Sequence, residues 1–182
     1  MLAIHKLLPA GRGLAPVLVE RAARVQLDWD VRQKSRFDAT DKQGRALGVF
    51  LPRGTCARGG DVLVAEDGSL IVVEAAPQRV LRVTACAEHG TPFDLLRAAY
   101  HLGNRHVALE LRADHLQLEP DHVLADLLRR MHLIVTEVEA PFEPETGAYA
   151  AGARPAHEHP AEPAHHGHGH DHDHASNGHS HG

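Results

Sequence analysis

Histidines crowd the C-terminal end of this chain, where ten of its 17 lie between His157 and His181. Neutral imidazole is the commonest metal-binding side chain, and a run interleaved with Gly and Asp lets several ring nitrogens surround one ion. A purification tag or neutral low complexity is the alternative, but Pro, Glu and Ala interrupt these histidines, whereas a tag is usually one unbroken run. The predicted ligands in this segment are His157, His159, His165, His166, His168, His170, His172, His174, His179 and His181.

Two further histidines, His101 and His106, stand five positions apart across Gly103. That spacing allows chelation, although a histidine near a loop is more often solvated or hydrogen-bonded. His106 is predicted at the start of a strand, on the same face as Glu110 and opposite Val107, so its ring is available to a partner outside the domain's own core. A twofold dimer axis beside it would bring two imidazoles together. His122, near the start of a predicted helix, is the weaker candidate ligand.

Other chemistry is not indicated. The two cysteines, Cys56 and Cys86, are interpreted as small buried side chains with no ligand role, because they form no Cys-x-x-Cys pair. The sequence contains no GxSxG, GxxxxGK[ST] or HExxH motif, so we expect no enzyme. A formal charge of -5 without a basic block argues against nucleic acid as a ligand.

The first part of the chain, residues 1–76, is predicted to be a small all-β domain. Apolar and polar residues alternate from Val25 to Val31, the period-2 pattern of a half-buried strand. Short apolar runs follow at Leu47 to Leu51, Val62 to Ala65 and Leu70 to Val73, separated by Gly-containing turns.

Residues 77–150 are predicted to form a ferredoxin-like βαββαβ domain, which makes the whole chain α+β. The expected order is a strand at Val80 to Ala85, a helix opened by Thr91-Pro92, a hairpin of His106 to Arg112 with Leu116 to Glu119, a helix from about Pro120 and a strand at Leu133 to Val138.

Helical spacing suggests which side chains of the two helices face the core. In the first helix Phe93, Leu96 and Tyr100, with Leu95 and Ala99, recur at intervals of three and four, and Gly103 is expected to end it in a left-handed conformation. The apolar stripe expected for the second helix is Val123, Leu124, Leu127, Leu128 and Met131.

The last segment, residues 151–182, contains no Val, Ile, Leu, Met or aromatic residue and is predicted to be disordered without a ligand. The N-terminus lacks the uninterrupted apolar stretch of a signal peptide, and no run approaches the roughly 20 apolar residues of a membrane helix. We therefore expect a cytoplasmic protein.

The segment Gly103-Asn104-Arg105-His106 closely resembles the hallmark of the UreE-type urease accessory proteins, which are nickel metallochaperones. The likeness extends to Glu119 to Leu124, Arg32 to Arg36 and Phe50 to Gly54. The resemblance implies an N-terminal domain for protein contacts, a dimerising metal domain, Ni²⁺ held between two copies of His106, and further nickel on the histidine-rich C-terminus. Some relatives carry a histidine where this chain has Pro120, which weakens the case for His122.

The expected function is nickel delivery for assembly of the urease active site, by a homodimer that meets the urease apoprotein and its GTPase accessory protein. Residue types alone leave the ion open, because imidazole also suits Zn²⁺ and Cu²⁺. Two other functions remain possible from the residues. A nickel or zinc storage protein would use the tail without His106, and a metalloenzyme would need an acid or base such as Glu110 beside a fixed ligand set.

Overall fold

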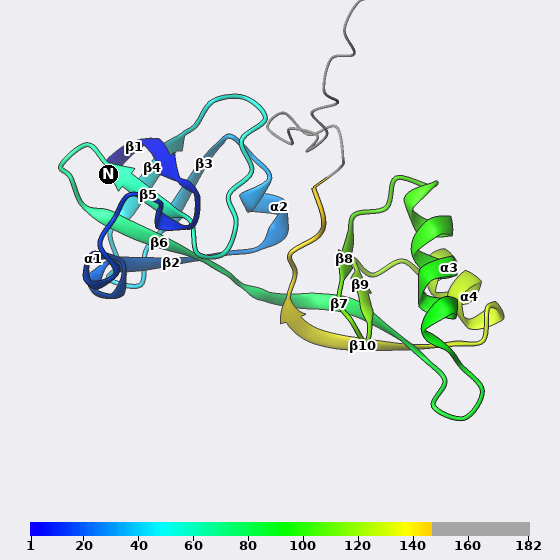
Figure 1. Cartoon of the computed structure of the whole chain (residues 1–182). Coiled ribbons are helices and arrows are strands. Elements are labelled where there is room, and N and C mark those ends of the chain that lie inside the picture. Colours follow the sequence, from blue (N-terminus) through cyan, green and yellow to red (C-terminus); the bar gives the residue numbers. More distant parts are fainter. Residues whose placement is uncertain (147–182) are drawn as a thin grey trace, which may run out of the picture. The chain divides into compact units, whose positions relative to one another are not determined.

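The computed structural model describes residues 1–146, which form two separate β-sheets (Figure 1). The predicted tail and its ten histidines lie outside the described residues. Among the residues described, no helix is both long and apolar enough to cross a membrane.

The first sheet has six strands in the order β2-β6-β5-β1-β4-β3. Its neighbours are antiparallel except for two parallel pairs, β1 with β4 and β2 with β6. The strands are β1 (Leu2–Leu8), β2 (Ala23–Leu27), β3 (Arg36–Thr40), β4 (Ala46–Phe50), β5 (Val62–Ala65) and β6 (Leu70–Ala75). The predicted β character of this domain is therefore confirmed.

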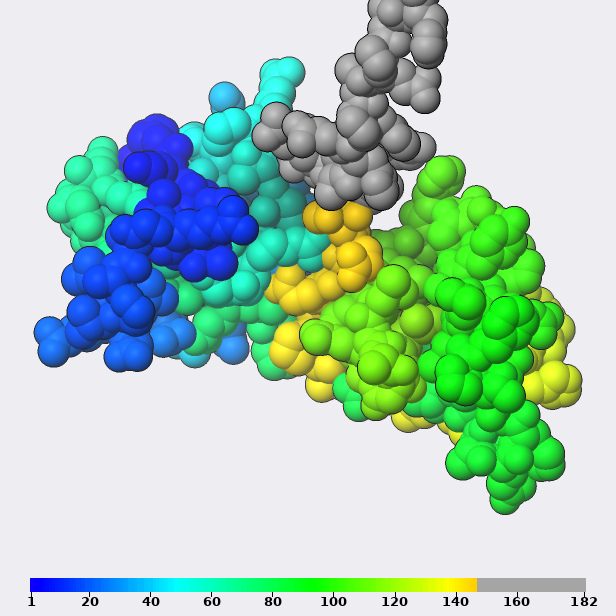
Figure 2. Space-filling model, viewed as in Figure 1, coloured from blue at the N-terminus to red at the C-terminus, as the bar shows by residue number. Residues whose placement is uncertain are grey.

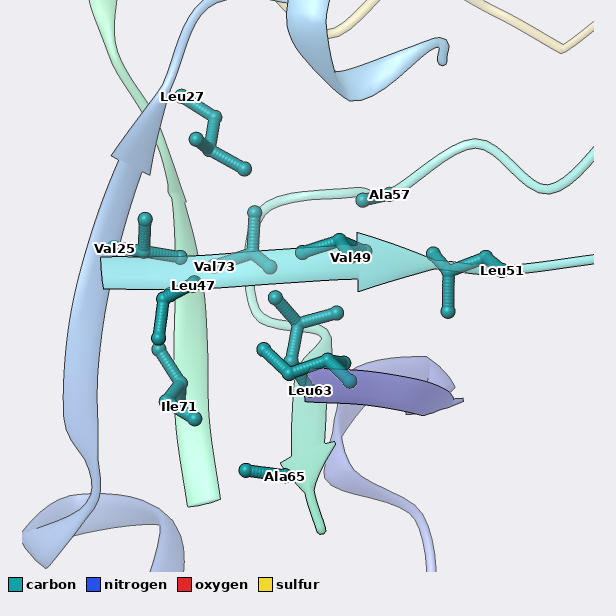
Figure 3. Close-up of a cluster of buried hydrophobic side chains, with 11 residues drawn as sticks. Val25, Leu27, Leu47, Val49, Leu51, Ala57, Leu63, Ala65, Ile71 and Val73 are labelled. Carbon is teal, nitrogen blue, oxygen red and sulfur yellow. The ribbon is translucent and has the colours of Figure 1, made fainter. Parts of the chain in front are cut away.

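Buried aliphatic side chains from five of these strands form one core (Figure 3). Val25, Leu47, Leu63 and Ile71 point into it and are inaccessible to solvent. Because β-branched and other aliphatic residues suit a pleated, half-buried surface, this core accounts for the strand pattern found in the sequence.

Several elements of the first domain were not predicted, strand β3 among them. The alternation that ran to Val31 breaks at Asp28, whose carboxylate accepts a hydrogen bond of 2.8 Å from the Val31 N–H and caps the short helix α2 (Trp29–Arg32). Strand β1, next to a 3-10 turn (η1, Pro9–Gly11) and the helix α1 (Pro16–Arg21), is also new.

The second sheet has the order β10-β7-β9-β8, with every neighbouring pair antiparallel. Its elements are β7 (Pro77–Ala85), α3 (Pro92–Gly103), β8 (Leu109–Leu111), β9 (Leu116–Leu118), α4 (His122–Arg130) and β10 (Leu133–Pro141). Both helices pack on the same face of the sheet (Figure 1), around a core that includes Val83, Leu102 and Leu128. The predicted ferredoxin-like arrangement is confirmed.

Helix α3 begins as predicted but turns a different face to the core. The Asp94 carboxylate accepts a hydrogen bond of 2.9 Å from the Thr91 N–H at the helix start. Leu95 is buried as predicted, and the other buried residues are Ala98 and Leu102. Phe93, Leu96 and Tyr100, which were predicted to face the core, are 62 %, 63 % and 66 % exposed.

The spacing of α3 explains that error. Both sets of three residues recur at the same intervals of three and four, so periodicity indicates two apolar faces without choosing between them. In helix α4 the predicted stripe is wrong at Val123, which is 59 % exposed, while Ala125 and Leu128 are buried.

A buried guanidinium connects α2 with the segment that follows β10. Arg32, which is inaccessible to solvent, donates hydrogen bonds to the carbonyl oxygens of Leu27 and Phe142 and forms an ion pair of 2.7 Å with Glu143. Glu143 also pairs with Arg58 at 3.2 Å. Trp29 lies against both guanidinium groups, at 5.3 Å from Arg32 and 5.2 Å from Arg58.

We expect Arg32→Ala to lower the free energy of unfolding by about 3 kcal/mol, because it leaves buried carbonyl oxygens and one carboxylate contact without their donor. Arg24→Ala is the matched control, since Arg24 forms a partly exposed ion pair of 3.2 Å with Glu74 and such pairs contribute about 1 kcal/mol or less. Urea denaturation of both variants measures the difference. Equal losses would contradict the role given to Arg32.

Candidate metal centre

The end of helix α3 determines where His106 lies. The N–H of His106 donates to the Gly103 carbonyl at 2.9 Å, and the N–H of Val107 donates to the Leu102 carbonyl at 3.2 Å. These two bonds form a Schellman motif, which requires a left-handed residue at its penultimate position. That residue is His106, with φ of 56°. The prediction that Gly103 would be left-handed is wrong, because Gly103 still belongs to the helix.

His106 therefore lies in a turn. The prediction that it begins a strand is wrong. Strand β8 starts three residues later, at Leu109. The exposed His106 side chain lines a pocket of about 460 Å³ together with Ala99, Val107 and Leu111, among others. A non-glycine residue held in the left-handed region costs about 1 kcal/mol or more, and such residues cluster at functional sites.

The described chain ends at the same pocket. The N–H of Glu145 donates to the Leu109 carbonyl of β8 at 2.9 Å, and both Glu145 and Thr146 line the pocket with His106. The described part of the chain therefore ends beside this imidazole.

Glu110 is not available as an acid or base beside His106. It was predicted to share an open strand face with that histidine, but it is buried, and Leu111 is exposed in its place. Its carboxylate accepts hydrogen bonds of 2.6 Å from the Arg112 side chain and from the Glu143 N–H. These bonds give Glu110 a structural role.

The other predicted ligands of the described chain do not meet His106. His101 lies in the last turn of α3, with its ring 5.4 Å from that of Tyr100, and it does not line the pocket. His122 begins α4 and lines a separate hollow of about 280 Å³ with Asp121 and others. Within residues 1–146 no three His, Cys, Asp or Glu side chains lie close enough together to hold an ion.

Residues 1–146 thus bring a single imidazole to this pocket. One imidazole of the described chain is too few ligands for a stable metal site, so a full set needs donors from a second copy or from the segment that begins after Thr146. His157 and the other predicted tail ligands lie outside the described residues and stay a prediction.

One chemically active residue was missed in the sequence. Cys86 is only half-buried, and its Sγ lies 3.9 Å from Nδ1 of His89. Hydrogen bonds from the backbone N–H groups of His89 and Glu88, followed by the His89 side chain, lower the pKa of Cys86 to about 7. Burial instead raises the pKa of Cys56. The signal was present as the Cys-x-x-His spacing of residues 86–89.

Comparison with known proteins gives matches over both domains. The family model described as the UreE urease accessory protein, N-terminal domain, matches residues 4–76, and the model of the C-terminal domain matches residues 78–174. The urease accessory protein UreE of Paracidovorax citrulli is 77 % identical over 152 residues, which cover 84 % of this chain and 72 % of the relative. The urease accessory protein UreE of Albidiferax ferrireducens is 70 % identical over 165 residues, which cover 91 % of this chain and 94 % of the relative.

The left-handed conformation of His106 makes a separate prediction for stability. Glycine has no Cβ and adopts positive φ without strain, so His106→Gly is expected to be more stable than His106→Ala by about 1 kcal/mol. Both variants lack the imidazole, and hence metal binding does not enter the comparison. Urea denaturation of the metal-free proteins measures it, and an alanine variant at least as stable as the glycine variant would argue against the conformation described.

Proposed function

The chain belongs to the UreE family of urease accessory proteins, a family of non-enzymatic chaperones, and from that premise we propose that it binds Ni²⁺ and delivers it for assembly of the urease active site. The observation that carries the proposal is His106, an exposed imidazole held by a helix ending in a pocket at which the described chain also ends. The ion is the cargo of this protein.

A homodimer would supply the second imidazole. Helix α3 exposes Phe93, Leu96 and Tyr100, and its residues Ala99 and Gly103 line the His106 pocket. The atoms of this helix lie uncovered at the surface in Figure 2. Pairing two copies through this apolar face would bury it and bring two His106 side chains to one twofold axis.

The tail would then act as a collector for that site. His157 lies eleven positions after Thr146, so the first tail imidazole can reach at most about 40 Å from the pocket. Covalent attachment at this range raises the local concentration of imidazole around His106. An ion caught by the tail can therefore pass inward by ligand exchange without being released to solvent.

Release of the ion from His106 to a recipient protein would also proceed by ligand exchange. A site made of two imidazoles and further exchangeable donors leaves room for an incoming ligand to join before an outgoing one departs. The urease apoprotein and its GTPase accessory protein are the proposed recipients, in the cytoplasm, and the first domain is the proposed surface for these contacts.

Urease activation in cells at limiting nickel tests the role of His106. We expect His106→Ala to lower urease activity at least about tenfold, because both copies of the ligand are lost from the dimer. His115→Ala is the control, since His115 does not line this pocket and bonds to Asp114 at 2.8 Å. Normal activation by His106→Ala would contradict transfer, and loss only on deletion of residues 151–182 would favour nickel or zinc storage.

The dimer is tested by adding a charge to the exposed face of α3. We expect Leu96→Asp to weaken self-association at least about a hundredfold, because the symmetric interface would bury two carboxylates at a cost of several kcal/mol. Val123→Asp adds the same charge at a similarly exposed residue of α4. Sedimentation equilibrium measures both. Equal effects of the two substitutions, or none, would exclude α3 as the interface.

A further inference from the structure

The loop between β7 and α3 holds a thiol and an imidazole together. Cys86 and His89 are separated by two residues, and their Sγ and Nδ1 atoms lie 3.9 Å apart. The loop closes through a hydrogen bond of 2.7 Å from the Gly90 N–H to the Cys86 carbonyl. A Cβ on residue 90 would lie 2.6 Å from that carbonyl oxygen and closer still to the Cys86 nitrogen, so only glycine fits.

The separation of the two side chains is close to that of two ligands on one metal ion. Bonds of about 2.3 Å to sulfur and about 2.0 Å to nitrogen, at a tetrahedral angle, place the two donor atoms roughly 3.5 Å apart. The observed 3.9 Å therefore needs a movement of only a few tenths of an ångström. An ordinary side-chain rotation supplies that movement, because the His89 ring is exposed.

Further donors surround this pair. Glu88 Oε2 lies 3.9 Å from the same Nδ1 of His89. Asp94 and His132 line the same pocket of about 610 Å³ as Cys86 and His89. His132 is held there in a left-handed conformation, with φ of 62°, immediately after α4. Arg97 also lines the pocket but lies 3.7 Å from Asp94, which neutralises part of its charge.

We propose that Cys86 and His89 form a second metal site, for a soft or borderline transition-metal ion of which Zn²⁺ is the reference. Thiolate with imidazole is the donor set that such ions prefer, whereas the His106 pocket offers nitrogen. Because residues 1–146 hold no preformed set of three ligands, two donors already lie close together and the others join when the ion arrives, from His132, Glu88 or water. None of these residues lines the His106 pocket, so this site does not depend on the proposed nickel transfer.

The thiol itself is the readout, because the tail contains many histidines and no cysteine. Full-length protein is treated with iodoacetamide in the presence or absence of saturating Zn²⁺, and alkylation of Cys86 and of Cys56 is followed separately by peptide mass spectrometry. We expect Zn²⁺ to slow the alkylation of Cys86 at least tenfold. Co²⁺ in place of Zn²⁺ is expected to give a thiolate charge-transfer absorption that Cys86→Ser abolishes and Cys56→Ser retains.

Three variants make the result specific to the pair. His89→Ala is expected to lose the protection, and so is Gly90→Ala, which keeps both ligands but displaces the loop; circular dichroism confirms that each is folded. His106→Ala is expected to keep full protection, which separates this site from the nickel pocket. Alkylation of Cys86 that Zn²⁺ does not slow, or protection that persists in His89→Ala, would overturn the proposal.

Discussion

The candidate site in the described residues depends on the hydrogen bonds and the ion pair that the buried Arg32 guanidinium makes with the segment after β10. The guanidinium binds the Phe142 carbonyl and Glu143, and so fixes the path of the chain as it leaves β10. A guanidinium taken out of water must have its hydrogen-bond donors satisfied, which makes this contact costly to break. Two hydrogen bonds from backbone N–H groups then hold this segment against β8. The Glu143 N–H donates to the Glu110 carboxylate, and the Glu145 N–H donates to the Leu109 carbonyl. The pocket around His106 is bounded by the residues so placed.

The candidate ligand itself is placed by helix geometry and not by a dedicated scaffold. A Schellman ending satisfies the last carbonyls of α3 and needs one residue at positive φ. Using histidine there instead of glycine costs backbone strain and gains an imidazole that points away from the core, into solvent. Of the two residues whose backbone forms this ending, Leu102 belongs to the core cluster and Val107, partly buried, packs against it. The same helix ending therefore packs the end of α3 on the core and exposes the His106 imidazole.

Much of the fold could be predicted from the sequence, because strand alternation, Gly-containing turns and the Thr91 to Asp94 helix start are local signals. The errors arose where two arrangements shared one local pattern. Phe93, Leu96 and Tyr100 have the same helical spacing as Leu95, Ala98 and Leu102, so only the packed sheet decides which face is buried. Glu110 was placed outside the core because its bond from the Glu143 N–H joins residues 33 positions apart and leaves no periodic trace in the sequence. Local sequence patterns were likewise insufficient to predict the conformation of the candidate site. The segment that contains His106 could be found by resemblance, but the conformation of that residue depends on where α3 ends.

The position of β1 has a consequence for the order in which the protein can fold during synthesis. This strand is made before the other strands of the described chain, yet it lies inside its sheet, between β4 and β5. Its partners are made some 40 to 60 residues later, and such non-local pairing delays folding. Until then its apolar side chains have no sheet to pack on, which is the interval in which a nascent chain is most exposed to aggregation and to chaperones. The histidines of the tail are translated after every strand of both sheets, so the first domain can be complete before the tail offers any imidazole to a metal ion.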